Sequence, residues 1–131
     1  MKGIFVKASA DTAAQTMCIR DFPEPYLETL GAAVGGDAEL VRPKGLERPY
    51  CMVVNESGLL LGLPVNLLGS ILYGIAEHGH PIVGNIVILK TEYDPENMGD
   101  RLAGLSDAEA GELVAELRTM TGGRVQFRKG E

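Results

Sequence analysis

The sequence predicts an α+β protein with a mixed or largely antiparallel sheet and about three helices packed mainly on one face. Three observations lead to this fold class. Short apolar, β-branched runs outnumber the amphipathic stretches, and the two kinds alternate without a regular strand–helix–strand unit. Hydrophobic residues make up 45% of the 131 residues and charged residues 23%, which is a globular composition. We therefore expect a single α+β domain over residues 1–131.

The first half of the chain predicts a hairpin, a helix and further strands. Strand signals at 4–6 and 16–19 flank a small polar turn, and the prolines at 23 and 25 end the extended structure. A helix then follows to residue 34, where Gly35 and Gly36 stop it. A short strand at 38–41 comes next. Strands at 51–54 and 59–61, on either side of the turn 55–58, predict a second hairpin.

The second half begins with a helix candidate over 65–78, which Gly79 and Pro81 would stop. The nearly continuous apolar run 82–89 predicts a central strand. Residues 91–104 are acidic and rich in turn residues, so an acidic surface loop is expected there. Ser106 and Glu109 form a capping box that starts the last helix, and residues 125–127 predict an edge strand.

Charge argues against some functions. Twelve Lys and Arg residues against eighteen Asp and Glu residues give a net charge of −6, so general nucleic-acid binding is not expected. No run approaches about 20 apolar residues, so no membrane span is predicted, and no signal peptide is recognisable. Eight of the eighteen acidic residues lie between residues 92 and 116, a segment that either forms a solvated face or docks on a basic protein.

The candidate ligand residues are two sets of polar side chains. Arg42, Lys44 and Arg48 fall within seven residues and predict a site for a small anionic ligand, since arginine suits bidentate phosphate recognition; the alternative is a solvated basic face. Asn55 and Asn66 can each read a ligand edge with an amide, or serve as a turn residue and a helix N-cap respectively.

No catalytic motif for hydrolysis or phosphate binding is present, so a non-enzymatic role is expected. A small hydrolase using Glu56 or His80 is a third alternative. His78 and His80 are two potential metal ligands without a third, and we interpret them as helix-end residues; no metal or cofactor is expected. Cys18 and Cys51 are interpreted as buried strand residues.

Four motifs occur in an order and spacing typical of one family: Val34-Gly35-Gly36 with Glu39, Asn55-Glu56-x-Gly58, Gly62-Leu63-Pro64-x-Asn66, and the run 82–88. Together they resemble the family of domain of unknown function 3846, over about residues 26–90, and the helix start at 104–109 agrees; Asp37 stands where an aromatic or aliphatic residue is common. The family occurs in phages, plasmids and bacterial genomes. The resemblance implies a small accessory protein of a mobile element, in the cytoplasm of a bacterial host, and assigns no functional residue.

These observations favour a small-ligand-binding accessory protein, in its most concrete form a phage counter-defence protein that sequesters a host nucleotide immune signal. The alternative is an acidic protein–protein modulator that binds and inhibits a host protein through residues 92–116. A homo-oligomer is expected in the first case, because a shared interface encloses a small ligand well. The small residues Ser70 and Gly74 are a candidate contact, either within the chain or with a second subunit.

Overall fold

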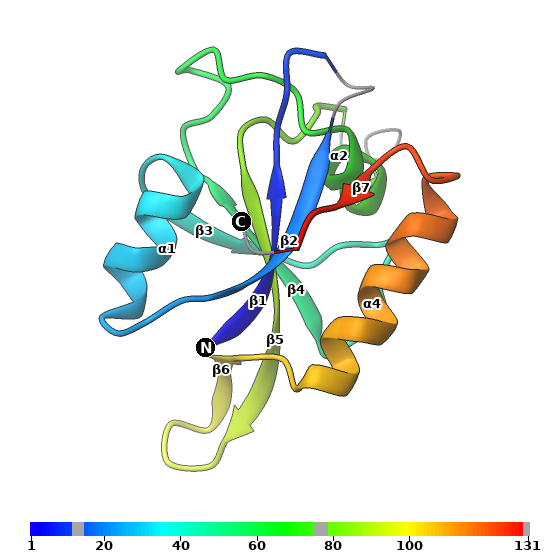
Figure 1. Ribbon diagram of the computed structural model, residues 1–131. Coiled ribbons are helices and arrows are strands. Elements are labelled where there is room, and N and C mark those ends of the chain that lie inside the picture. Colours follow the sequence, from blue (N-terminus) through cyan, green and yellow to red (C-terminus); the bar gives the residue numbers. More distant parts are fainter. Residues whose placement is uncertain (12–14, 75–78, 130–131) are drawn as a thin grey trace.

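The computed structural model describes residues 1–11, 15–74 and 79–129, and it confirms an α+β fold with a mixed, mostly antiparallel sheet of seven strands (Figure 1). In these ranges the strands are β1 (Lys2–Lys7), β2 (Thr16–Asp21), β3 (Ala38–Val41), β4 (Tyr50–Asn55), β5 (Ile86–Asp94), β6 (Gly99–Ala103) and β7 (Gln126–Phe127). The helices are α1 (Tyr26–Val34), α2 (Leu67–Tyr73) and α4 (Asp107–Met120).

The strands follow the order β3-β4-β5-β1-β2-β7, and β6 pairs with the second half of β5. All neighbours are antiparallel except β2 and β7, which are parallel. The central pair is set by apolar side chains, with Ile4 opposite Ile88 and Phe5 opposite Val87. β3 and β7 are therefore the two ends of the main path, as the expected edge strand at 125–127 requires.

Helices cover both faces of the sheet. Alternation along each strand sends one set of apolar side chains to α2 and α4, where Leu68, Leu72, Leu113 and Leu117 are fully buried. The other set meets Leu30 and Val34 of α1 (Figure 1). Two of the three described helices thus share a face, as expected. The opposite face carries α1 alone, so the helices lie on both faces and most of them on one.

Capping residues in the sequence predicted several helix ends correctly. Gly35 ends α1 with a left-handed φ of 85°. The predicted capping box starts α4, with Ser106 Oγ accepting from Glu109 N and the Glu109 carboxylate accepting from Ser106 N. α2 is shorter than the predicted 65–78, because Gly74 caps it at a φ of 88°. Residues 75–78 lie outside the described part of the chain, so the rest of that prediction is not addressed.

Three extended segments were predicted wrongly. Residues 59–61 form a turn in place of a strand, since Leu61 N donates to Ser57 O and Leu63 N donates to Gly58 O. The central strand starts at Ile86 and not at residue 82, because Gly84 has a φ of 80° and donates to Pro64 O. The segment 91–104 is no loop: it forms the end of β5 and the whole of β6, a hairpin that projects from the sheet (Figure 1).

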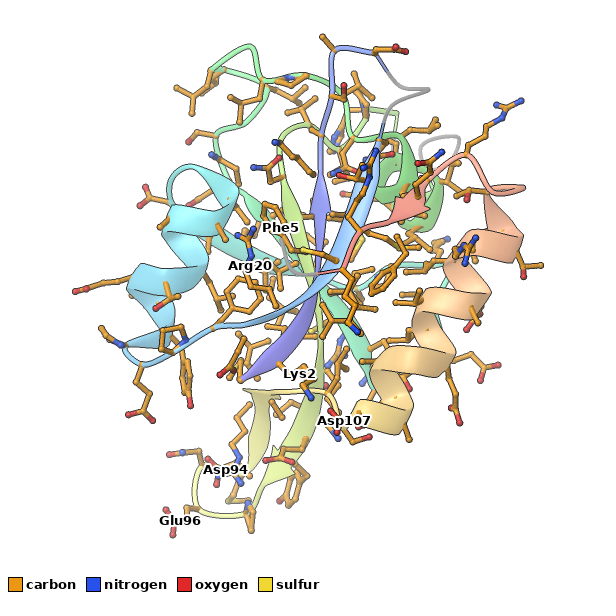
Figure 2. All side chains as sticks on the ribbon, in the orientation of Figure 1. Lys2, Phe5, Arg20, Asp94, Glu96 and Asp107 are labelled. Carbon is orange, nitrogen blue, oxygen red and sulfur yellow. The ribbon has the colours of Figure 1, made fainter. Side chains whose placement is uncertain are left out.

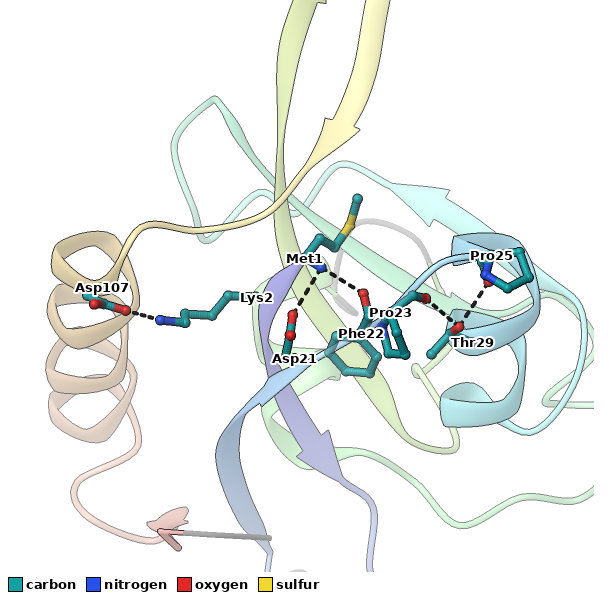
Figure 3. Close-up of polar contacts among 8 residues, drawn as sticks. All are labelled: Met1, Lys2, Asp21, Phe22, Pro23, Pro25, Thr29 and Asp107. Carbon is teal, nitrogen blue, oxygen red and sulfur yellow. Dashed lines mark hydrogen bonds and ion pairs between the residues drawn. The ribbon is translucent and has the colours of Figure 1, made fainter.

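Polar contacts join β1 to α4 and fix the start of α1 (Figure 3). Lys2 forms an ion pair with Asp107 in the first turn of α4. On the opposite side, Thr29 Oγ1 donates to Pro23 O at 2.6 Å and is 2.9 Å from Pro25 O, which fixes the first turn of α1. The Arg20 guanidinium lies 4.0 Å above the centre of the Phe5 ring, a cation–π contact between β2 and β1 (Figure 2).

Candidate functional site

The five predicted ligand residues do not form one site. Arg42 and Arg48 lie around a carboxylate on the α1 face of the sheet, and Lys44 lies beside α2. Asn66 is enclosed in the core, and Asn55 borders an open hollow at the other end of β4.

Arg42 is committed to contacts within the chain. Its Nη2 donates to Thr91 Oγ1 at 2.8 Å and to Asp100 Oδ2 at 3.1 Å. Arg48 approaches the same Asp100 oxygen at 3.9 Å and is largely exposed. The Asp100 carboxylate therefore offsets the local positive charge, and this pair of arginines joins the end of β3 and the following loop to β6. Four hollows in the described part of the chain, including the one that Asn55 borders, have none of Arg42, Lys44 and Arg48 in their lining.

Lys44 faces a different element. The aliphatic part of its side chain lies about 3.6–3.8 Å from the position that a Cβ on Gly74 would occupy. The neighbouring Gly45 N donates to Leu72 O, so this part of the loop is fixed to the end of α2. A cation at a helix C-terminus is favoured by the helix dipole. The predicted convergence of the three cations is therefore not observed.

Asn66 is a structural residue. Its side chain is completely buried, and its Nδ2 donates to Val6 O and Gly84 O. Its Oδ1 accepts from Gly69 N, as the predicted N-cap should, and from Gln15 Nε2 at 2.6 Å. With all these bonds made away from solvent, Asn66 contacts no ligand in this conformation, and only its capping interpretation is confirmed.

Asn55 combines a turn role with a position at a hollow. Its Oδ1 accepts from Ser57 N at 2.8 Å, and its Nδ2 donates to Val34 O at 3.1 Å. These bonds confirm the turn interpretation and fix the segment after β4. Asn55 nevertheless lines the hollow, so it is the one member of the five that lies at a described concave site.

The hollow lies between β3, the end of β4, the end of α2 and residues 80–83, and its interior volume is about 190 Å³. Its floor is apolar, formed by Val41, Val54, Ile82 and Val83. Its polar and aromatic lining consists of Glu39, Asn55, Glu56, Tyr73 and His80. An apolar floor with a few convergent polar groups is the usual anatomy of a small-molecule site.

Two features give the hollow its chemistry. The rings of Tyr73 and His80 are neighbours, with centroids 5.4 Å apart and planes tilted by 47°. Glu39 and Glu56 bring two carboxylates to the same lining, and both are exposed. Carboxylates accept hydrogen bonds and attract positive charge, so they oppose an anion. The small anionic ligand predicted from the sequence therefore does not suit this hollow.

The sequence analysis singled out Glu56 and His80 separately, and the structure brings both to the hollow. His80 Nδ1 lies 3.3 Å from Pro81 O. Tyr73 was missed, and Glu39 was noted only as part of a family motif, because a tyrosine at a helix end and a glutamate in an edge strand give no sign of a shared site. Only the register of β3 on β4 brings Glu39 beside Val54. His78 lies outside the described residues; within them, no three His, Cys, Asp or Glu side chains group as a metal site would require.

The two cysteines are buried in strands, as expected. Burial raises the pKa of the Cys51 thiol to about 11, since the apolar core disfavours the charged thiolate. A thiol of this kind is a poor nucleophile near neutral pH. Cys51 is therefore a core residue and not a reactive one.

Half of the acidic residues in 92–116 are paired. Glu92, Asp100, Asp107 and Glu109 form ion pairs with Arg101, Arg42, Lys2 and Lys90 respectively. The Lys90 ammonium and the capping-box amide hold the pKa of Glu109 below its ordinary value. Asp94 and Glu96 lie at the tip of the β5–β6 hairpin (Figure 2). Hydrogen bonds from the Asn97 side chain and the Glu96 backbone amide lower the pKa of Asp94. Residues 92–116 therefore form a hairpin and the first part of α4, both held by ion pairs, and not a continuous acidic surface.

Comparison with family models assigns the chain to one family. The model described as "Domain of unknown function (DUF3846)" matches residues 1–117 of the 131. The chain belongs to this family. The match includes every element that builds the hollow, from β3 through residues 80–83, and it leaves out only the end of α4 and β7. No curated protein and no solved structure matches the chain. No helix in the described residues of this family member is long and apolar enough to cross a membrane.

Proposed function

We propose that this member of the family is a non-enzymatic small-ligand-binding protein, and that its hollow takes the nucleobase of a nucleoside or nucleotide. The observation that carries the proposal is the convergence of the Tyr73–His80 ring pair and two carboxylates on one apolar-floored hollow. Neither the predicted cationic cluster nor Asn66 contributes, so the site is a different one from that expected from the sequence.

The lining fits a base in three ways. An aromatic wall stacks a nucleobase, an interaction worth about 1–3 kcal/mol per base. Glu39 and Glu56 accept hydrogen bonds from exocyclic amines and ring N–H groups. The floor of Val54 and Ile82 excludes water beneath the ring. A hydrogen-bond donor on a flat ring is the chemistry that this combination recognises.

Size and charge restrict the ligand further. Drug-sized sites commonly measure about 300–1,000 Å³, so a hollow of 190 Å³ suits a single base and not a whole dinucleotide. The two carboxylates repel phosphate, so the phosphates of a nucleotide must lie outside the hollow. In its most concrete form, the proposal makes the protein a phage counter-defence protein that holds a host nucleotide signal by its base.

The test is a thermal-shift and calorimetry panel with adenosine, guanosine, cytidine and uridine, their 5′-monophosphates, and cyclic dinucleotides. At about 100 times its dissociation constant, a ligand should stabilise the fold by about 2.7 kcal/mol. A nucleoside should bind at least as tightly as its monophosphate, because the rim carboxylates oppose phosphate. Mass spectrometry of the recovered ligand should show it unchanged, whereas turnover would overturn the non-enzymatic role and favour the hydrolase alternative.

Two matched variants locate the binding. Glu56→Lys reverses a charge at the hollow, and Glu47→Lys makes the same change at an exposed position outside it. Binding should be lost in Glu56→Lys and retained in Glu47→Lys. The proposal is overturned if no nucleoside or nucleotide stabilises the unmodified protein, or if Glu56→Lys binds as well as Glu47→Lys.

A further inference from the structure

The outer edge of β3 has no partner strand among the described residues. Glu56 N donates to Asp37 O, so the backbone at Asp37 points toward β4. Backbone groups alternate along a strand, which turns Glu39 and Val41 toward β4 as well and leaves the N–H and C=O groups of Ala38 and Leu40 directed outward. These groups form a template for pairing with another strand.

Apolar side chains are exposed beside this edge. Leu40 is 40% exposed and Leu27 is 77% exposed, and Tyr26 lies with them around a shallow apolar groove on the α1 face. Leu30 and Leu102 form the base of this groove. An open strand edge next to exposed leucines is a surface that soluble proteins usually cover.

We propose that a second copy of this chain covers this surface, with the two β3 strands paired antiparallel about a two-fold axis and Leu40 opposite the partner's Leu40. A two-fold axis perpendicular to the sheet keeps each side chain on its own face. A residue can therefore lie opposite only a residue whose side chain points to the same face, and at the axis one residue lies opposite its own copy. Of the registers that use the outward-directed groups, two pair three β3 residues of each copy: one is centred on Leu40, and the other is centred on Glu39.

Charge and polarity select between these registers. Centring on Glu39 sets two carboxylates directly opposite each other, which is destabilising. Centring on Leu40 sets two leucines opposite each other on the α1 face, where Leu27 and the apolar groove extend the contact. In that register Glu39 lies opposite the partner's Val41, and Ala38 lies opposite the partner's Arg42. The sheet then continues through both copies.

Pairing also changes the hollow, and this part of the inference rests on the proposed function. Glu39 and Val41 both line the hollow, and both belong to β3. The partner's Val41 would lie beside Glu39 at the rim, so the second copy contributes a residue to each site. The pairing itself is measured without any ligand, so its failure and the failure of ligand binding are distinguishable.

Single cysteines test the register. Paired residues that exchange both hydrogen bonds have Cα atoms about 5.5 Å apart, within the disulfide range of about 4.4–6.8 Å. Leu40→Cys should therefore give a disulfide-linked dimer under mild oxidation. Glu39→Cys should not, since its diagonal separation from the partner's residue 39 is about 7–8 Å. Cys18 and Cys51 are 1% and 0% exposed, so they do not interfere.

Light scattering over a concentration series tests the pairing without a covalent cross-link. The unmodified chain and Leu60→Lys should be dimers, because Leu60 is exposed but belongs to the turn after β4 and not to β3. Leu40→Lys should be a monomer with unchanged circular dichroism. A monomeric unmodified chain at every concentration overturns the proposal, as does cross-linking through residue 39 in place of residue 40.

Discussion

Arg42 and Asp100 form an ion pair of 3.1 Å between the end of β3 and β6. The sequence suggested each of them for a different function: Arg42 for binding an anion, and Asp100 for an acidic docking surface. In the folded chain each offsets the charge of the other, and Thr91 supplies a further acceptor to the guanidinium. Two functional interpretations based on local charge are thereby weakened by a single contact.

Replacing Arg42 should cost more stability than replacing Arg48. The Arg42 side chain is 31% exposed and makes two short hydrogen bonds, whereas Arg48 is 77% exposed and only approaches Asp100 at 3.9 Å. We expect Arg42→Ala to lower the free energy of unfolding by about 1 kcal/mol and Arg48→Ala by less than about 0.5 kcal/mol. Urea denaturation measures both, and equal losses would contradict the structural role given to Arg42.

Asn66→Ala should be among the most destabilising single substitutions. It removes an N-cap and leaves buried backbone groups at Val6 and Gly84 without their side-chain partner. We expect a loss of about 3 kcal/mol in the free energy of unfolding. The control is Asn97→Ala, an exposed position with one side-chain bond to Asp94, for which a loss below about 1 kcal/mol is expected. A small effect of Asn66→Ala would contradict the buried network.

Acid should weaken the contact between β5 and α4. Because Lys90 and Ser106 hold the pKa of Glu109 below its ordinary value, this carboxylate contributes its full stability above its unfolded pKa of about 4.3. The contribution is lost as the pH falls through the lower folded pKa. Glu109→Gln retains a carbonyl oxygen for the capping box but has no charge. Its urea stability should fall less than that of the unmodified chain between about pH 5 and pH 3; parallel curves would refute this assignment.

Cys51 should resist thiol reagents while the protein is folded. With a pKa raised to about 11, only about one thiolate in a thousand is present near pH 8, and the side chain is 0% exposed. Ellman's reagent should react with neither cysteine of the native protein, and with both after unfolding in guanidinium. Rapid reaction of one thiol in the native state would show that the core around β4 opens.

Local patterns predicted the parts of this fold that depend on near neighbours in the sequence. The Ser106–Glu109 box and the Asn66 cap are bonds across three residues, so the sequence displays them directly. The apolar residues 59–61 misled the prediction because hydrophobicity alone cannot distinguish a strand from a tight turn held by Ser57 and Gly58. β6 was missed because its five residues, GDRLA, include two charged side chains and one large apolar one, and so lack the apolar alternation of a half-buried strand.

The candidate site was predicted least well, since it depends on contacts between distant segments. Glu39, Tyr73 and His80 come from an edge strand, a helix end and the segment before β5. No spacing in the sequence links them. The cations close together in the sequence predicted a site at the wrong place. Arg42 and Lys44 lie on a loop where the first side chain contacts β6 and the second lies beside the end of α2.

The most direct measurement of the proposed function is a nuclear magnetic resonance titration of the ¹⁵N-labelled protein with the tightest nucleoside or nucleotide of the panel. We predict that amide shifts concentrate at Asn55, Glu56 and Gly58 and around Tyr73 and His80, where the hollow lies. The amides of Arg42 and Arg48 should change little. Shifts centred on the Arg42–Arg48 loop, with the hollow unaffected, would contradict the account and return the site to the cationic cluster.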